Sequence, residues 1–247
     1  FFSNRDVMLD SDIIIFGASP YLLSKNNESM LNSIDLSYFE RKISKLNFKK
    51  IIYLSSASVY GLTDNEIPFT ETDELLGVSS YACEKMYFES IIQNYCKKIK
   101  ANALILRIAG LFDLKKKEQT SKNLLDKIFY QLNNKVVDNL DIVHSGNQIR
   151  NFCEVSFLKK VIEILKNSNH ESSIYNVANT PPIRLKDMMN KINLKIETPL
   201  KINYKSSSET NIHNSLDSSP LFNEHKSLSE FYINEDILIK KLISSCS

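Results

Sequence analysis

Short apolar runs rich in β-branched residues alternate along this chain with longer segments of helical period. The runs DIIIFGAS at residues 12–19 and KKIIYLSSASVYG at residues 49–61 have the composition of strands that are buried on both faces. Between them, residues 29–46 place apolar side chains at roughly helical intervals, as one face of a helix does. The three segments therefore predict a β-α-β unit.

The alternation continues toward the C-terminus. A helix is predicted over residues 80–97, a strand over residues 101–110 and a helix near residues 120–134. Strands that alternate with helices of this size form a parallel sheet with helices on both faces. The sequence thus predicts an α/β fold with a doubly wound, Rossmann-like parallel sheet.

From about residue 138 the segments become shorter, which indicates a smaller C-terminal region packed at the carboxyl end of the sheet, where α/β proteins bind ligands. The Ser- and Asn-rich residues 205–230 have the composition of a long loop. Residues 234–244 predict a closing helix with Asn234 as its N-cap. The other elements expected in this region are a helix over residues 154–167, a strand over 172–179, a helix after Pro181-Pro182 and a strand at 200–205.

Composition argues against several classes of protein. Lys and Arg number 31 and Asp and Glu number 29, without a basic stripe, so a nucleic-acid partner is not expected. No apolar stretch approaches the ~20 residues of a membrane span and no signal peptide is recognisable, so a soluble, cytoplasmic protein is expected. The four cysteines and four histidines have no metal-binding spacing, so no metal site is predicted.

The stretch YACEK contains Tyr81 and Lys85, four residues apart. This spacing alone is weak, because YLLSK at residues 21–25 and YFERK at residues 38–42 share it. Tyr81 and Lys85 differ from these pairs in their surroundings, since they lie on one face of a predicted helix near its start. Tyr81 also follows Ser56, at the end of a buried strand, by 25 residues. They are therefore the candidates for acid/base chemistry.

With these segments in place, the sequence resembles the extended short-chain dehydrogenases, the NAD(P)-dependent epimerases and dehydratases of nucleotide sugars. DIIIFGAS is similar to the family's fourth strand, IIYLSSASVYG to its serine strand and YACEK to its catalytic helix. LILRIAGLF, GNQIRNFCEV and SIYNVANTPPIRLKDMM resemble the segments that follow in the family. The resemblance spans residues 12 to about 195.

The resemblance implies an epimerase or a 4-keto reductase that uses NAD or NADP on a nucleotide-activated sugar. Tyr81 would be the catalytic acid/base, Lys85 its partner and a ligand of the cofactor ribose, and Ser56 the hydroxyl that holds the substrate oxygen. A free phenol titrates near pH 10, so a cationic lysine and the positive nicotinamide are expected to favour the phenolate.

Other positions receive a role only from the resemblance. Arg150 would bind the nucleotide diphosphate through its planar fork, with a surface salt bridge as the alternative. Ala57-Ser58 stands where the 4,6-dehydratases of the family carry an Asp-Glu pair, which disfavours dehydration. The remaining expected cofactor ligands are Phe16, Gly17, Ala18, Asn32 and Ala109, and the remaining expected substrate ligands are Ser58 and Gly110.

The family begins with a strand and a G-x-x-G-x-x-G turn that binds the cofactor pyrophosphate. This chain has five glycines, no two of them closer than 16 residues, so we expect a fragment that lacks this segment and leaves NAD or NADP undecided. The expected domains are an incomplete dinucleotide-binding domain at residues 1–137 and a mainly substrate-binding region at residues 138–247. The resemblance also implies a homodimer through the helices at residues 29–46 and 80–97.

Two alternatives to this function stay open. One is a non-catalytic relative that binds a dinucleotide or nothing. The other is a reductase of a small carbonyl compound that is not a nucleotide sugar.

Overall fold

The computed structural model describes residues 10–17, 41, 43–115, 124–134, 139–143, 145–168, 170–205 and 212–244. Two compact units make up the chain, and each is assembled from separate stretches of sequence. Unit 1 comprises residues 1–61, 74–107 and 162–175, and unit 2 comprises residues 62–73, 108–161 and 176–247. The expected division between residues 137 and 138 remains a prediction.

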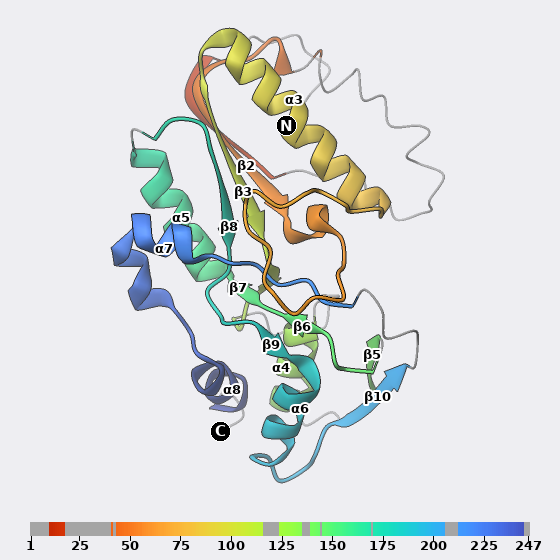
Figure 1. Ribbon diagram of the computed structural model, residues 1–247. Coiled ribbons are helices and arrows are strands. Elements are labelled where there is room, and N and C mark those ends of the chain that lie inside the picture. Colours follow the sequence, from red (N-terminus) through yellow and green to blue (C-terminus); the bar gives the residue numbers. More distant parts are fainter. Residues whose placement is uncertain are drawn as a thin grey trace. The chain divides into compact units, whose positions relative to one another are not determined.

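A four-stranded sheet has the order β1-β2-β3-β8 (Figure 1). Its strands are β1 (Asp10–Phe16), β2 (Asn47–Ser56), β3 (Asn102–Ile108) and β8 (Ser173–Val177). Strands β1 and β2 pair in parallel, with Ile14 opposite Ile51. The centre of β2 is at most 1% exposed, as its continuous apolar run predicts. The α/β class with a parallel sheet is therefore confirmed.

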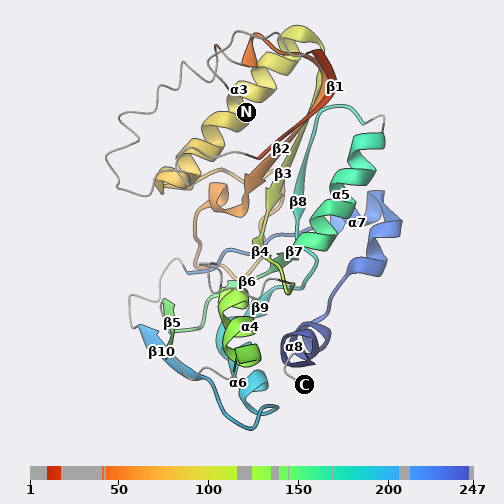
Figure 2. The ribbon, with the colours of Figure 1, turned by 180° about the vertical axis from the view of Figure 1, so that it is seen from behind.

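Helix α3 (Ser80–Ile99) lies along one face of this sheet (Figure 1, Figure 2). It begins at Ser79, whose hydroxyl accepts the backbone N–H of Ala82 at 3.1 Å, and its apolar side, including Phe88, packs on β2. The helix predicted over residues 80–97 is thus confirmed and is two residues longer. The predicted homodimer through this helix remains a prediction.

A buried lysine links β2 to the end of helix α5 (Val155–Asn167). Lys50 donates to the carbonyls of Leu165, at 3.0 Å, and of Ser168. A cation at this position satisfies the unpaired carbonyls of a helix C-terminus and opposes the negative end of the helix dipole. Lys50 therefore fixes the last turn of α5, which belongs to unit 1, to strand β2 of the same unit.

Unit 2 contains three helices around a common apolar core: α4 (Leu124–Asn134), α6 (Leu185–Asn193) and α8 (Glu235–Ser244). Helices α4, α6 and α8 are neighbours in both ribbon views (Figure 1, Figure 2). Their core side chains include Leu125, Ile128, Met188, Met189, Leu238, Ile239 and Leu242.

In the described part of unit 2, short strands also form three pairs. Strand β4 (Gly110–Phe112) pairs in parallel with β7 (Phe152–Glu154). Strand β5 (Asn139–Val143) pairs in parallel with β10 (Lys201–Lys205). Strand β6 (Ile149–Arg150) pairs antiparallel with β9 (Ile183–Arg184).

The predicted closing helix is confirmed as α8, and the side-chain oxygen of Asn234 accepts the Ile237 N–H at 2.9 Å. The loop predicted over residues 205–230 is wrong in its second half, which forms α7 (Ser219–Glu224) and the 3₁₀ helix η3 (Lys226–Phe231). Leu221 and Leu228 are fully buried and anchor these elements, which are too short to produce a helical period in the sequence. Residues 206–211, and the helix predicted over 29–46 as far as residue 40, lie outside the described residues.

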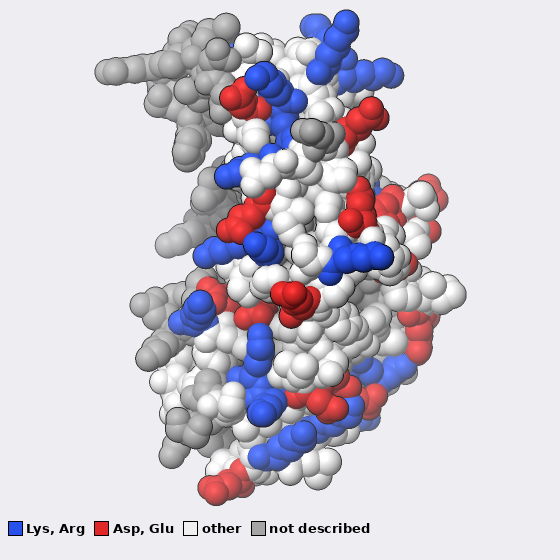
Figure 3. All heavy atoms as spheres, turned by 90° about the vertical axis from the view of Figure 1, so that its left-hand side faces the viewer, with Lys and Arg blue, Asp and Glu red and all other residues white. Residues whose placement is uncertain are grey.

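None of the helices in the described part of the chain combines the length and the apolar composition that a membrane span requires. Figure 3 shows one face of the molecule, where basic and acidic side chains are interspersed. The expected absence of a nucleic-acid partner remains a prediction.

Candidate functional site

Strand β2 ends at Ser56, and a single 3₁₀ turn, η2 (Ala57–Tyr60), follows it. The hydroxyl oxygen of Ser56 accepts two hydrogen bonds from Ser58, one from the backbone N–H at 3.2 Å and one from the hydroxyl at 3.0 Å. A serine hydroxyl has two acceptor lone pairs and one proton. Because Ser58 occupies both lone pairs, Ser56 is left with its proton to donate.

Tyr81 lies in the first turn of α3, where its side chain is partly buried and makes a hydrogen bond with Ser56. Burial raises the pKa of the Tyr81 phenol, the hydrogen bond with Ser56 lowers it, and the Glu84 carboxylate raises it again; the net direction is upward. Unit 1 therefore brings Ser56 and Tyr81 together, with Tyr81 in its protonated form.

Lys85 lies one turn further along α3 and is 2% exposed. Its ammonium donates to the Leu54 carbonyl at 2.8 Å and lies 5.0 Å from the centre of the Tyr53 ring and 5.7 Å from that of Tyr81. Burial lowers the pKa of Lys85 to about 8, against the opposing effect of nearby carboxylates.

The three predicted catalytic side chains thus share one region of unit 1. In the chain by itself burial dominates the pKa of Tyr81, and the Lys85 ammonium lies near the two rings and donates to a carbonyl. The expectation that Lys85 and the positive nicotinamide together favour the phenolate remains a prediction.

The turn η2 and the segment just before α3 lie in close contact, and this contact fixes the positions of Ser56 and Tyr81. The N–H of Gly77 donates to the Val59 carbonyl at 2.9 Å, and a Cβ at Gly77 would lie 2.6 Å from the Cβ of Ala82. Only glycine leaves room for η2 to contact the start of α3 here. Sequence reasoning missed Gly77, although a glycine four residues before Tyr81 in a glycine-poor chain was an available signal.

The predicted cofactor ligands fall partly inside the described residues. Phe16 ends β1 and stacks on Tyr53 with ring centres 5.5 Å apart, and a Cβ at Gly17 would meet Leu54 at 3.0 Å. Ala18 and Asn32 lie outside the described residues.

The donor set of unit 1 fits one end of NAD(P). A hydroxyl, a phenol and an ammonium at the carboxyl end of β2 match the ribose and carboxamide of its nicotinamide half. The sequence contains no closely spaced glycines that would hold the pyrophosphate. Lys85 and Tyr81 are the residues that would hold the nicotinamide half, and their contact with a cofactor remains a prediction.

Ala109 and Gly110, the expected contacts beside nicotinamide and sugar, belong to unit 2. The N–H of Ala109 donates to the Val177 carbonyl at 3.0 Å, and Gly110 is exposed at the start of β4. A Cβ at Gly110 would meet the Phe152 ring at 3.1 Å. Their contact with a ligand remains a prediction.

Arg150, also in unit 2, is partly buried at the end of β6. One of its terminal nitrogens donates to the carbonyls of Ile149 at 2.9 Å and Ile212 at 2.6 Å. Burial lowers the pKa of Arg150 to about 10. No carboxylate in the described ranges forms an ion pair with Arg150, so the alternative of a surface salt bridge has no support among these residues.

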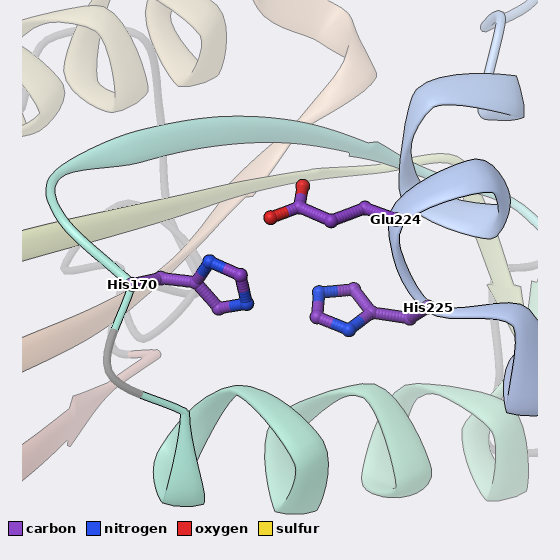
Figure 4. Close-up of side chains that lie close together, drawn as sticks. All are labelled: His170, Glu224 and His225. Atoms are coloured by element: carbon purple, nitrogen blue, oxygen red, sulfur yellow. The ribbon is translucent and has the colours of Figure 1, made fainter.

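Figure 4 draws His170, Glu224 and His225. His170 precedes β8 in unit 1, whereas Glu224 ends α7 and His225 follows it in unit 2. These side chains therefore belong to different units. The expected absence of a metal site remains a prediction.

Comparison with known proteins gives a consistent result. Residues 23–178, well over half of the chain, match the family described as the NAD dependent epimerase/dehydratase family. A curated relative, dTDP-4-dehydro-6-deoxyglucose reductase of Escherichia coli, is 25% identical over 175 residues, which cover 70% of this chain and 54% of the relative. The chain thus spans about half the length of this relative.

Two solved structures have a similar fold. The structure of RMD from Pseudomonas aeruginosa complexed with NADPH has a TM-score of 0.70 at 13% identity, over 95% of this chain and 81% of that one. UDP-N-acetylglucosamine 4-epimerase from Methanobrevibacter ruminantium M1, in complex with UDP-N-acetylmuramic acid, has a TM-score of 0.67 at 20% identity, over 94% and 77%. At these identities the likeness establishes the fold alone.

Proposed function

This chain belongs to the NAD-dependent epimerase/dehydratase family, and we propose that the complete protein is an NAD(P)-dependent 4-keto reductase or epimerase of a nucleotide-activated sugar. The curated relative is named as a reductase of a dTDP-linked keto sugar, and one structural neighbour was solved with a UDP-linked sugar. These names support the substrate class, and the residues of the chain supply the chemical argument.

The observation that carries the nucleotide-sugar assignment is the environment of Arg150. Its guanidinium is partly buried and bonds carbonyl oxygens, and no carboxylate in the described ranges balances its charge. A buried charge without a counter-ion is costly, and a bound anion would reduce that cost. A diphosphate fits because arginine donates two parallel bonds to phosphate oxygens. A small neutral ketone would leave the charge unbalanced.

Burial of the Tyr81 phenol, which outweighs the opposing hydrogen bond with Ser56, favours reduction over epimerisation. Ser58 donates to Ser56, and Ser56 in turn has its proton to donate, either to Tyr81 or to a substrate oxygen. Burial keeps Tyr81 protonated at neutral pH, so that it can give its proton to the oxygen of a carbonyl under reduction. Epimerisation by this family's route begins instead with a phenolate that removes a hydroxyl proton, which needs a lowered pKa.

The residues then have separate tasks in the proposed reduction. NAD(P)H, when bound, supplies the hydride that adds to the carbonyl carbon. Tyr81 supplies the proton to the carbonyl oxygen, and Ser56 holds that oxygen by a hydrogen bond. Lys85, whose ammonium lies beside the Tyr81 ring, provides positive charge and a donor for ribose hydroxyls.

The test uses the full gene product with NADH and NADPH and a panel of UDP-, dTDP- and GDP-linked 4-keto sugars. Consumption of one reduced cofactor per product molecule, lost in Tyr81→Phe, is expected for the reductase. Interconversion of two sugars without net cofactor consumption identifies the epimerase. Reduction of a small ketone that survives Arg150→Met, or cofactor binding without any turnover, would overturn the proposal in favour of one of the two alternatives.

A further inference from the structure

A buried ion pair joins strand β3 to helix α3 within unit 1. Arg107 on β3 is 4% exposed and Glu89 on α3 is 3% exposed. The Nε of Arg107 lies 3.3 and 3.2 Å from the two carboxylate oxygens of Glu89, and its Nη2 lies 2.8 Å from Oε2. This is a two-pronged contact, in which the orientation of both groups is fixed.

Two further buried side chains extend the pair toward the candidate catalytic residues. The Nη1 of Arg107 donates to the hydroxyl of Tyr60 at 2.9 Å, and the guanidinium carbon lies 5.0 Å from the centre of the same ring. On the other side, the hydroxyl of Ser55 donates to Oε1 of Glu89. Each member of this charge network (Ser55, Tyr60, Glu89 and Arg107) is at most 4% exposed.

Each end of the charge network is adjacent to a candidate catalytic group. Ser55 precedes Ser56 in β2, and Tyr60 is the last residue of η2, the turn that Ser56 caps. Glu89 follows Lys85 by one helical turn and Tyr81 by two. The network therefore holds the serine turn on one side and the Tyr-Lys helix on the other.

We propose that Glu89 and Arg107 are positioning residues that set the separation of Ser56 from Tyr81 and Lys85, acting through Ser55 and Tyr60. This inference rests on the proposed function, because it assigns Ser56, Tyr81 and Lys85 to the reaction. Neither Glu89 nor Arg107 touches the reacting atoms in this assignment. Their effect is on geometry, to which catalysis is sensitive, since a displacement of about 1 Å can cost on the order of a hundredfold in rate.

Stability alone is a weaker explanation for this ion pair. The free energy lost when two charges are removed from water offsets much of their attraction, and apolar side chains of similar volume often stabilise a core as well or better. An apolar replacement, however, cannot fix the Ser55 and Tyr60 hydroxyls. A double variant with apolar side chains therefore separates the two explanations.

The experiment measures kcat, KM and thermal stability of the full gene product in the 4-keto reductase assay. The variants are Glu89→Gln, Arg107→Lys and the double change Glu89→Leu with Arg107→Met. We expect all three to lower kcat by about 10- to 100-fold with KM within about threefold, and the double variant to lose less in melting temperature than Glu89→Gln, because it leaves no buried charge unpaired. Lys50→Met, the matched control, removes a buried cation of the same unit whose hydrogen bonds go to the end of α5, and should lower the melting temperature without lowering kcat.

A second measurement does not depend on turnover and so separates failure of this inference from failure of the proposed function. The ¹³C chemical shift of the Tyr81 ring carbon that bears the hydroxyl reports its hydrogen bond with Ser56. If the charge network positions Ser56, the double variant should shift this signal toward its value in Ser56→Ala. A wild-type signal in the double variant, or an unchanged kcat in it, would overturn the inference even where the reductase assay succeeds.

Discussion

Replacing Lys85 with Met should change how the stability of the protein depends on pH. Lys85 is 2% exposed, and burial lowers its pKa from 10.5 to about 8. Between these two pH values the unfolded chain binds a proton that the folded chain has released, so the free energy of unfolding rises with pH. Below pH 8 both states are protonated, and the folded state carries the whole cost of about 3 kcal/mol, at about 1.4 kcal/mol per pKa unit.

The Met variant avoids this cost because its side chain has a similar length and no charge. It also loses the hydrogen bond to the Leu54 carbonyl, which is worth about 1 kcal/mol at any pH. At pH 7 the variant should therefore be more stable than the wild type by about 2 kcal/mol, and near pH 11 it should be less stable by about 1 kcal/mol.

Urea unfolding at a series of pH values from about 7 to 11 measures this crossover as the difference in unfolding free energy between variant and wild type. Lys98→Met, which removes an exposed lysine from the same helix, is the matched control for a change of helix charge. A Lys85→Met difference that stays constant over this range, or that favours the variant more as pH rises, would refute the reasoning from burial.

Three further changes test separate parts of the structure. Gly77→Ala should lower stability by about 1 to 3 kcal/mol, because the added methyl overlaps the Ala82 side chain, and thermal unfolding without such a loss would contradict this close approach. Ser58→Ala should lower kcat about tenfold in the 4-keto reductase assay at a stability cost near 1 kcal/mol, because Ser56 regains a free lone pair; an unchanged kcat would remove Ser58 from the site. Asn234→Ala should cost about 1 kcal/mol by removing the N-cap of α8 and leave kcat unchanged, as thermal unfolding and the same assay would show; equal stability would argue against the cap.

The sequence was sufficient for the elements whose signals are local. Helix α3 has a serine cap and an apolar stripe, and β2 has a continuous apolar run that ends in serines, so both were predictable with the position of the Tyr-Lys pair. The hydrogen bond between Ser56 and Ser58 was not predictable, because it depends on the 3₁₀ turn that follows β2. Local patterns thus located the candidate residues but did not fix their hydrogen bonds.

The charge network could not be predicted from local sequence patterns either, although the sequence contains one indication that a buried charge needs a partner. Arg107 interrupts the apolar strand LILRIAG, and a charge in a buried strand requires a partner. The sequence does not say which carboxylate provides it, because Glu84 and Glu89 lie on the same helix. The pairing follows from the rotation of α3 over the sheet, which is a tertiary property.

The spacing of Tyr81, Lys85 and Glu89 explains how one helix carries three different electrostatic environments. Four residues exceed one helical turn only slightly, so the three side chains form one stripe against the sheet. Tyr81 is partly exposed, whereas Lys85 and Glu89 are at most 3% exposed.

Glu89 forms its ion pair with Arg107 and therefore offsets the charge of Lys85 only in part. Burial accordingly remains the largest influence on the pKa of Lys85. The cost of the Lys85 charge is thus a property of the protein without ligands. A bound group with oxygen acceptors, such as the ribose of the proposed cofactor, would reduce that cost and raise the pKa of Lys85. The stability advantage of Lys85→Met at pH 7 should consequently shrink when NADH or NADPH is present at saturating concentration.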